Sequence, residues 1–254
     1  MPTMKNAKRI KEYYELYWSE DNVKEQEKDD VREYEHEALS YAFEILKHHF
    51  NSMKNRKVLE IGPGKGKNML QFIRMGAKVT AVDISKNSLK NSKEYLKRHN
   101  ALKNSTLLEM DAHDMKFKRN EFDIVFIQSA LMHLDAPKIT QQCRKVLKKN
   151  GVFLFIEPSN DNAFVKPYRI LLSKYKEINP SYLGYKQFKG ISKQFHRSEI
   201  KGFYLFSFAS LIFRKSRLLY WLSATILKRM ENILLYAFPA LEKKLLLYVS
   251  INIK

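Results

Sequence analysis

The sequence predicts an α/β protein built on a parallel, doubly wound β-sheet. Three observations predict this fold. Short apolar runs alternate five times with helical patterns, the runs have no polar face, and the first of them ends in a glycine-rich turn. Strands that are apolar on both faces belong to a parallel sheet covered by helices, and right-handed crossovers place helices on both of its faces.

The N-terminal region precedes the first predicted strand. Residues 1–35 are highly charged and dotted with aromatic side chains, which predicts a helical arm. From 33 to 50, apolar residues recur at helical spacing, so we predict a helix with one buried stripe. The stripe comprises Ala38, Ala42, Ile45, Leu46 and His49.

The alternating region spans the middle of the chain. Strands are predicted at 57–61, 77–84, 105–110, 122–128 and 151–157, and helices at 68–75, 85–100 and 136–149. Ser85 is the predicted N-cap of the second of these helices, with Leu89, Tyr95 and Leu96 on its inner face. The third helix is expected to stop at Asn150-Gly151.

The alternation ends after Pro158. Residues 159–200 are polar, basic and rich in tyrosine, with no clear period. The apolar, aromatic stretch 202–213 is the predicted sixth strand. A helical pattern covers 218–238, and 244–253 is the predicted last strand.

The charge of the chain is strongly positive and uneven. The 254 residues carry a formal net charge of +19, and residues 160–254 alone hold 17 basic and 5 acidic residues, a net +12. This balance predicts an anionic partner, either nucleic acid, a membrane surface or an acidic substrate. A solvated, lysine-rich surface is the alternative.

The single cysteine and the N-terminal residues indicate the cellular compartment of the protein. Cys143 is alone, which excludes an internal disulfide and a cysteine-based metal cluster, and no His or acid spacing predicts a metal site. The first residues lack the apolar core of a secretory signal. We therefore expect a cytoplasmic protein.

The turn after the first strand predicts a ligand site. Gly62, Gly64 and Gly66 let a small molecule approach bare main chain at the strand tips, where open parallel sheets bind ligands. The spacing fits neither the P-loop nor the dinucleotide fingerprint. Glu60, two residues before Gly62, would repel a pyrophosphate and suits a cationic ligand. The alternative is an ordinary glycine turn.

Two further acids follow the next strands. Asp83 lies 19 residues beyond Gly64, where a carboxylate can accept hydrogen bonds from ribose hydroxyls. Asp111 and Ala112 follow the third strand, placed to meet an adenine edge. Asp83 as a helix N-cap and Asp111 as a loop acid are the simpler alternatives.

Five segments together resemble the class I S-adenosylmethionine-dependent methyltransferases, of the type 11/25-like group. The resemblance covers roughly 55–160 and implies a Rossmann-like seven-stranded sheet with its last strand antiparallel. It also implies S-adenosylmethionine across the tips of strands one and four. The segments are EIGPGKG at 60–66, VD at 82–83, DA at 111–112, FDIVFIQSALMHL at 122–134 and LKKNGVFLFIE at 147–157.

The resemblance implies a set of cofactor contacts. The turn of Gly62, Gly64 and Gly66 would hold the methionine end of the cofactor, and Asp83 would hold the ribose. The adenine would contact Ile84, Asp111 and Ala112. Gln128 would lie near the sulfonium, and the acid Glu60 would be a favourable neighbour of its positive charge. His133 is a candidate general base, and a packing residue is the alternative. Tyr17 and Trp18 either close over the cofactor or pack the arm.

The motifs leave the acceptor open. Residues 128–131 lack the N/D-P-P-Y/F-type sequence motif that is typical of enzymes that methylate the amino groups of nucleic-acid bases. Apolar clusters at 202–249 alternate with basic residues, and no uncharged run reaches the ~18–20 residues of a spanning helix. This pattern favours amphipathic helices at an anionic interface or a helical lid, with a core-packing cap as the alternative. Candidates for the acceptor pocket are Tyr182, Tyr185, Phe188 and Tyr204.

We therefore expect a methyltransferase that acts on a small-molecule, lipid or glycan-precursor acceptor, cytoplasmic and peripheral to a membrane surface. The alternative is an RNA methyltransferase that uses the basic C-terminal third, and the third hypothesis is a non-catalytic relative in a protein assembly. The predicted organisation is an arm and first helix at 1–52, a cofactor-binding core at 53–160, and a helical cap that completes the sheet at 161–254.

Overall fold

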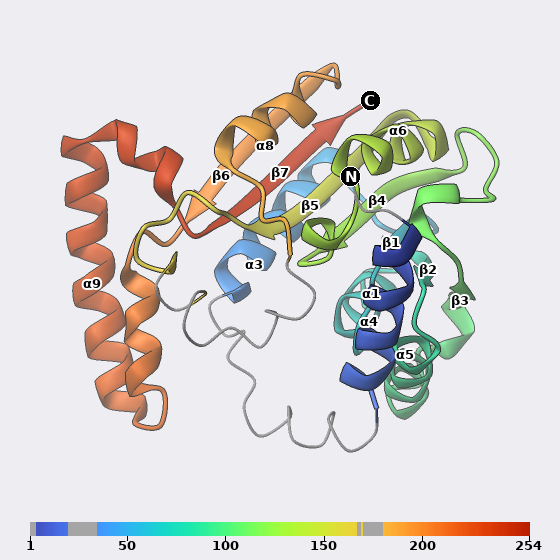
Figure 1. The fold of residues 1–254 in the computed structure, drawn as a ribbon, viewed down its shortest axis with the longest axis horizontal. Helices are drawn as coiled ribbons and strands as arrows, with labels where there is room; N and C mark the ends of the chain where they lie inside the picture. Colours follow the sequence, from blue (N-terminus) through green and yellow to red (C-terminus); the bar gives the residue numbers. More distant parts are fainter. Residues whose placement is uncertain (1–3, 20–34, 167–168, 170–179) are drawn as a thin grey trace.

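A computed structural model describes residues 4–19, 35–166, 169 and 180–254, and its centre is one seven-stranded sheet (Figure 1). The strands are β1 (Lys57–Ile61), β2 (Lys78–Asp83), β3 (Ser105–Glu109), β4 (Phe122–Gln128), β5 (Leu147–Pro158), β6 (Arg197–Phe203) and β7 (Leu247–Ile253). The α-helices are α1 (Met4–Tyr17), α3 (Glu35–Phe50), α4 (Lys67–Arg74), α5 (Lys86–Arg98), α6 (Ala136–Val146), α8 (Tyr185–Ser192) and α9 (Arg217–Ala237). Short 3₁₀ helices are η2 (Leu102–Asn104), η3 (Ala112–Asp114), η4 (Leu131–His133), η5 (Ser207–Phe213) and η6 (Pro239–Lys244).

The strand order is β3-β2-β1-β4-β5-β7-β6. Strands β1 to β5 pair in parallel, whereas β7 is antiparallel to both β5 and β6. The predicted doubly wound sheet with an antiparallel last strand is confirmed. Because the order reverses between β1 and β4, their carboxyl ends form the crevice where such sheets bind ligands.

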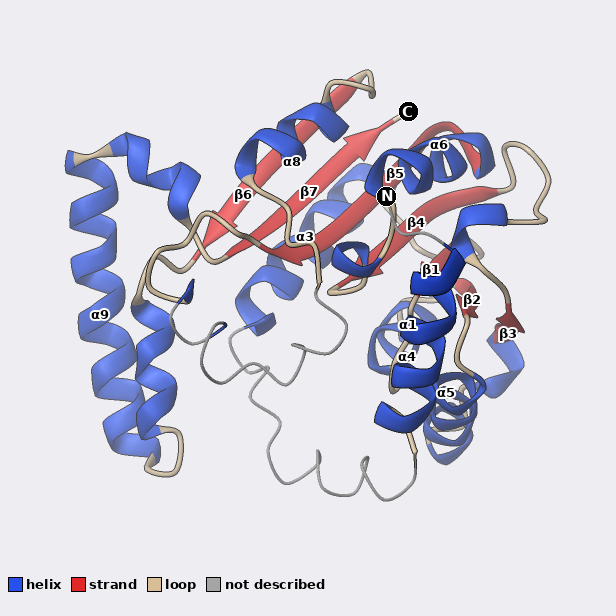
Figure 2. Ribbon diagram, in the orientation of Figure 1, coloured by secondary structure: helices blue, strands red, loops and turns tan. Residues whose placement is uncertain are grey.

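Helices cover both faces of the sheet, and alternate strand residues supply the two cores (Figure 2). On one face Val58, Ile124 and Phe126 pack with α3, α4 and α5. On the other, Leu59 and Phe155 pack with α6 and α8. This alternation follows from the period-two geometry of a strand, and it explains why the central strands read as unbroken apolar runs.

The second helix of the alternating region is capped as predicted. The Ser85 hydroxyl accepts a hydrogen bond from the Ser88 backbone N–H. Its inner face differs from the prediction, because Leu96 is buried while Leu89 and Tyr95 are only partly buried. Small polar residues, Ser88 and Ser92, take the remaining inner positions.

Three other local predictions are corrected. Strand β6 lies at Arg197–Phe203, ahead of the predicted 202–213, where η5 forms instead. Helix α6 ends at Val146, because Leu147 already pairs with Phe122 of β4 and a bulge follows before Val152. His49 is exposed, and Phe43 joins the buried stripe of α3 in its place.

Helix α9 stands at the opposite end of the molecule from α1 and α5 (Figure 1). It packs against η5 and η6 rather than over the sheet. Within the described ranges, no helix combines the length and the apolar character needed to cross a membrane.

Candidate functional site

The turn after β1 is built on three glycines, which contribute no side chains of their own to the strand tips. Gly62, Gly64 and Gly66 all have positive φ, at 74°, 55° and 77°, a region that disfavours residues with a side chain. A Cβ at Gly62 would lie 3.0 Å from Cβ of Ala130, and one at Gly66 only 3.1 Å from Cα of Ser92. Both the conformation and the close packing therefore require glycine.

A serine of α5 supports this turn from behind. The Ser92 hydroxyl donates to the Gly64 carbonyl oxygen over 2.9 Å, and the Gly62 N–H donates to the Val82 carbonyl oxygen over 3.0 Å. The turn is thereby fixed between the tips of β1 and β2. Sequence reasoning found the glycines but not the serine, because a serine at a helix inner face carries no recognisable signal.

Glu60 is the penultimate residue of β1, and it is buried, 1% exposed. Asn68 Nδ2 lies 3.4 Å from its Oε1, while Oε2 has no hydrogen-bond partner among the described residues. Burial raises the pKa of Glu60 to about 8. An unsatisfied buried carboxyl oxygen is unfavourable, so this group is suited to meet a ligand that carries positive charge.

Gln128 is fixed in position at the tip of β4. Its Oε1 accepts a hydrogen bond from Asn68 Nδ2 over 2.7 Å, and its Nε2 donates to Glu35. Glu35, which is 4% exposed at the start of α3, also accepts from the Ser129 hydroxyl over 3.2 Å. An acid is common in the first turn of a helix, because it interacts favourably with the helix dipole. Nothing in the sequence therefore indicated that Glu35 would reach the strand tips.

Asp83 ends β2 and is partly exposed. Its two oxygens accept hydrogen bonds from the Ser85 backbone N–H over 2.9 Å and from the Ser88 hydroxyl over 2.7 Å. Burial raises the pKa of Asp83 above its usual range. Each carboxylate oxygen has a further acceptor position, so Asp83 can bind ligand hydroxyls while it keeps these contacts. Ile84 follows it, half-buried.

Asp111 and Ala112 lie after β3. Asp111 Oδ1 accepts from the His113 backbone N–H over 2.8 Å and lies 2.7 Å from His113 Nδ1. Because His113 Nε2 accepts from the Asp135 N–H over 3.1 Å, the ring proton is on Nδ1. Asp111 thus caps η3, as the loop-acid alternative describes, while its adenine contact stays a prediction. Ala112 is buried.

His133 lies at the end of η4, next to the tip of β4. Its Nε2 is 2.7 Å from the Tyr14 hydroxyl of α1, and burial lowers the pKa of His133 to about 4. The imidazole is therefore neutral near pH 7. The Glu157 carboxyl group, buried at the end of β5, accepts the backbone N–H groups of Ala130 and Leu131 over 2.8 and 2.7 Å and so fixes the start of this segment.

The α1 arm, residues 4–19, packs on the same strand tips. The Trp18 ring covers the glycine turn, since a Cβ at Gly64 would lie 3.1 Å from its ring. Glu15 accepts the backbone N–H groups of Lys86 and Asn87 over 2.8 and 3.0 Å at the N-terminus of α5. Arm packing is thus shown for Trp18.

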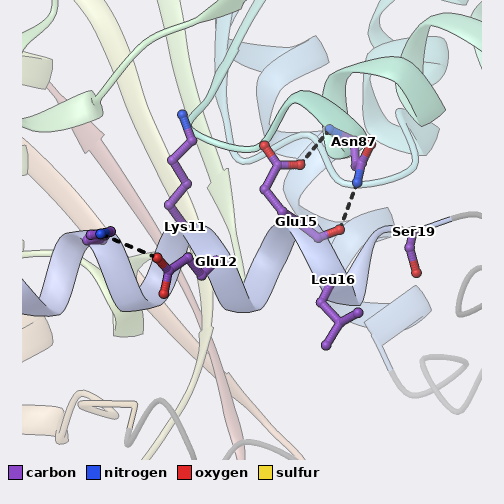
Figure 3. Close-up of a pocket in the computed structure, with 7 residues that line it drawn as sticks. Lys11, Glu12, Glu15, Leu16, Ser19 and Asn87 are labelled. Carbon is purple, nitrogen blue, oxygen red and sulfur yellow. Dashed lines mark hydrogen bonds and ion pairs between the residues drawn. The ribbon is translucent and has the colours of Figure 1, made fainter.

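A surface groove of about 640 Å³ runs along the outer side of the α1 arm, where Glu15 faces Asn87 of α5 (Figure 3). It is lined by the arm rather than by the strand tips. The four predicted acceptor-pocket aromatics do not form one pocket either. Phe188 is fully buried against Phe155 and Tyr248, so it belongs to the core. In the part of the chain that the structure describes, no group of three His, Cys, Asp or Glu side chains is placed to hold a metal ion.

Comparisons with known proteins identify the central segment. Residues 59–155 match the family model described as "Methyltransferase domain". The ubiquinone biosynthesis O-methyltransferase of Actinobacillus pleuropneumoniae is 25% identical over 126 residues, which are 48% of this chain and 53% of that protein. The ubiquinone/menaquinone biosynthesis C-methyltransferase UbiE of Proteus mirabilis is 29% identical over 125 residues, 48% of this chain and 47% of that protein.

A solved structure extends the likeness to the fold of most of the chain. Phosphoethanolamine N-methyltransferase 2 of Haemonchus contortus, in complex with S-adenosyl-L-methionine, superposes with a TM-score of 0.60 at 20% identity, over 85% of this chain and 52% of that chain. The present chain spans about half the length of the curated relatives that it matches. The resemblance to class I methyltransferases seen in the motifs is confirmed for the central segment.

Proposed function

We propose, from the methyltransferase domain at residues 59–155, that this protein transfers a methyl group from S-adenosylmethionine to a small-molecule, lipid or glycan-precursor acceptor at a membrane surface. The observation that carries the proposal is Glu60, a buried carboxyl group directly before the glycine turn, with one oxygen that has no hydrogen-bond partner among the described residues. A sulfonium cation at these strand tips would satisfy that charge.

The residues present fit the cofactor. The main chain of Gly62, Gly64 and Gly66 would lie against its methionine end, and Asp83 would accept hydrogen bonds from the ribose hydroxyls. The adenine would contact Ile84, Asp111 and Ala112. Gln128 and Glu60 would lie near the sulfur. When bound, the cofactor supplies an electrophilic methyl group. The protein contributes alignment and the exclusion of water, which the Trp18 ring over Gly64 already favours.

His133 and Tyr14 would orient the acceptor. The neutral His133 ring and the Tyr14 hydroxyl form a hydrogen-bonded pair beside the tip of β4. A histidine with a pKa of about 4 is a weak proton acceptor. The pair is therefore better suited to hold an acceptor hydroxyl or amine in line than to carry a proton away.

The acceptor class rests on two observations. The curated relatives are named for quinone biosynthesis, which supports an apolar, lipid-like acceptor. The C-terminal third exposes large apolar side chains along α9 together with its basic residues. The RNA alternative needs a polar, basic groove, so this mixed surface favours a lipid environment over RNA. In this proposal 1–52 forms the arm and first helix, 53–160 the cofactor core and 161–254 the cap.

Calorimetry with S-adenosylhomocysteine tests the cofactor claim. We expect the wild-type protein to bind it and Asp83→Ala to bind at least about ten-fold more weakly, because charge-assisted hydrogen bonds to the ribose are lost. Ser88→Ala is the matched control, since it removes a partner of Asp83 but keeps the carboxylate. Absence of binding to the wild-type protein, or equal affinity of Asp83→Ala and wild type, would reject the proposal.

A further inference from the structure

The C-terminal paddle, defined as η5, α9 and η6 (residues 207–244), exposes an apolar helix face. Along α9 the side chains of Leu218, Leu222, Ile226, Ile233 and Tyr236 are all exposed, with Ile233 at 68% and Tyr236 at 91%. Their spacings of 4, 4, 7 and 3 residues place them on one side of an α-helix. The stripe therefore runs along nearly the whole of α9 and faces away from the protein.

The inner side of α9 is anchored by a charged group. Glu231 is buried and accepts the backbone N–H groups of Leu205, Phe206 and Ser207 over 2.8, 3.2 and 3.0 Å. Lys228, on the same side, lies 3.2 Å from Glu37 of α3. The amphipathicity of α9 is thus reversed relative to an ordinary surface helix, because its outer side is the apolar one.

This exposed face is too extended to be incidental. Scattered surface apolar residues are normal, but a contiguous apolar stripe on a monomer marks an interaction surface. Further large side chains extend the stripe at both ends of α9, and one lies beside it. They are Ile212 and Phe213 at the start, Phe238 at the end and Trp221, 60% exposed, at the flank.

The charges around the stripe indicate what covers it. Residues 207–244 contain seven basic and two acidic residues, and one of the acids is the buried Glu231. Basic side chains lie before the stripe, near its middle and after it in the sequence. They are Arg214, Lys215 and Arg217, then Lys228 and Arg229, then Lys243 and Lys244. An anionic partner complements this arrangement.

A second copy of the chain fits this surface poorly. In an antiparallel pair of α9 helices, the exposed Arg229 of each copy would lie close to the other near the middle of the contact. Like charges placed opposite one another oppose association. A bilayer accepts them, because long basic side chains extend to the headgroups while their stems remain on apolar surface.

We propose that the outer face of α9 lies flat on an anionic lipid bilayer, with the apolar stripe among the upper acyl chains and the flanking Lys and Arg side chains on the lipid phosphates. The exposed Arg229 near the middle of α9 suits a helix that lies in the interface plane. The inference rests on the proposed function and deepens it, because it assigns the surface that would hold the protein at the membrane in which a lipid-like acceptor is dissolved. The docking itself is measured without methyl transfer.

Vesicle co-sedimentation tests the docking. The full chain is mixed with vesicles of equal parts phosphatidylcholine and phosphatidylglycerol, and with pure phosphatidylcholine vesicles. We expect binding to the anionic vesicles only, weakened by salt. The triple variant Leu222→Glu, Ile226→Glu, Ile233→Glu should lose it, and these exposed positions leave the core intact.

A matched pair of charge variants separates docking from general attraction of a basic protein. Arg214→Glu, Lys215→Glu and Arg217→Glu together should weaken vesicle binding about ten-fold or more. Lys93→Glu, Lys97→Glu and Arg98→Glu on α5 make the same change in net charge at exposed positions on the opposite end of the molecule, and should bind nearly as wild type. Equal losses in the two variants would overturn the proposal.

Tryptophan fluorescence places the helix in the interface. Trp221 is exposed and Trp18 is buried, so a blue shift on vesicle addition should disappear in Trp221→Phe while that variant still sediments with the vesicles. No vesicle binding by the wild-type protein would overturn the proposal. So would a stable dimer in lipid-free solution that Ile226→Glu, Ile233→Glu dissociates. Retained S-adenosylhomocysteine binding in these variants separates such a failure from failure of the methyltransferase proposal.

Discussion

The Tyr14 hydroxyl lies 2.7 Å from Nε2 of His133, across 119 positions of sequence, and joins the N-terminal arm to the segment after β4. The two rings also meet edge to face, with centroids 5.3 Å apart. The arm therefore helps to bury His133, and burial lowers the pKa of this histidine to about 4.

This contact predicts how His133 titrates. In Tyr14→Ala, water reaches the imidazole, and we expect the pKa of His133 to rise from about 4 toward its ordinary value. Histidine NMR across pH 3.5–8 measures it, with His133→Gln used to assign the signal. Glu12→Ala, at an exposed position of the same helix, should leave the titration unchanged. A wild-type His133 that titrates near its ordinary value would contradict the burial argument.

The glycine turn predicts a difference between two glycine substitutions. Gly64→Ala combines a positive φ of 55° with a Cβ 3.1 Å from the Trp18 ring, so we expect a loss of ~1–2 kcal/mol and a shift in Trp18 emission. Gly190→Ala meets nothing within 4 Å in the interior of α8 and should stabilise by up to ~1 kcal/mol. Urea unfolding measures both. Equal effects would show that the turn does not require glycine.

The pKa of Glu60, raised to about 8, predicts a pH dependence of cofactor binding. Below pH 8 this carboxyl group is mostly protonated, whereas a bound sulfonium favours the carboxylate, so binding releases a proton. We therefore expect the affinity for S-adenosylmethionine to increase as pH rises from 6 to 8, by at most ~10-fold per pH unit. S-adenosylhomocysteine, which lacks the sulfonium, should change less.

Isothermal titration with the two ligands measures this difference, and Glu60→Gln should remove it because the amide does not titrate. Identical pH slopes for the two ligands in the wild-type protein would show that Glu60 does not sense the sulfonium. Binding of S-adenosylhomocysteine by the Glu60→Gln variant is the control, because it shows that the site itself is intact.

Glu231 predicts a large loss of stability. Glu231→Ala leaves the backbone N–H groups of residues 205–207, two of them fully buried, without their acceptor. We expect a loss of about 3 kcal/mol or more in the free energy of unfolding. Glu242→Ala, at an exposed acid of the same paddle, should stay within about 0.5 kcal/mol of wild type. A loss below ~1 kcal/mol for Glu231→Ala would show that these bonds do not anchor α9.

Much of the core could be predicted from local pattern. Strands β1 and β4 were predicted at their observed bounds, because a continuous apolar run that stops at glycine or at polar residues has few alternatives. The Ser85 cap was predicted because a cap bonds within four residues. The position of β6 was missed, since its residues 197–203 alternate poorly and pair only with the last strand of the chain.

Some residues of the candidate site could be recognised in the sequence, and others could not. The glycines, Glu60 and Asp83 were recognised because their spacing along one strand-turn-helix unit carries the signal. Glu35, Glu15 and Ser92 were not, because each resembles an ordinary helix residue until the fold brings it to the strand tips. The prediction that Phe188 lines the acceptor pocket was wrong. An aromatic residue in a polar stretch suggested a pocket, whereas this side chain is buried in the core against the sheet.

By itself the sequence determined the alternation of strands and helices, the glycine-rich turn after β1 and the excess of positive charge near the C-terminus, because each depends on residues close together along the chain. Only the tertiary structure decided that Tyr14 meets His133, that Trp18 covers Gly64 and that α9 turns its apolar side outward. These relationships join segments far apart in the sequence, and the packing of the whole sheet selects which segments meet.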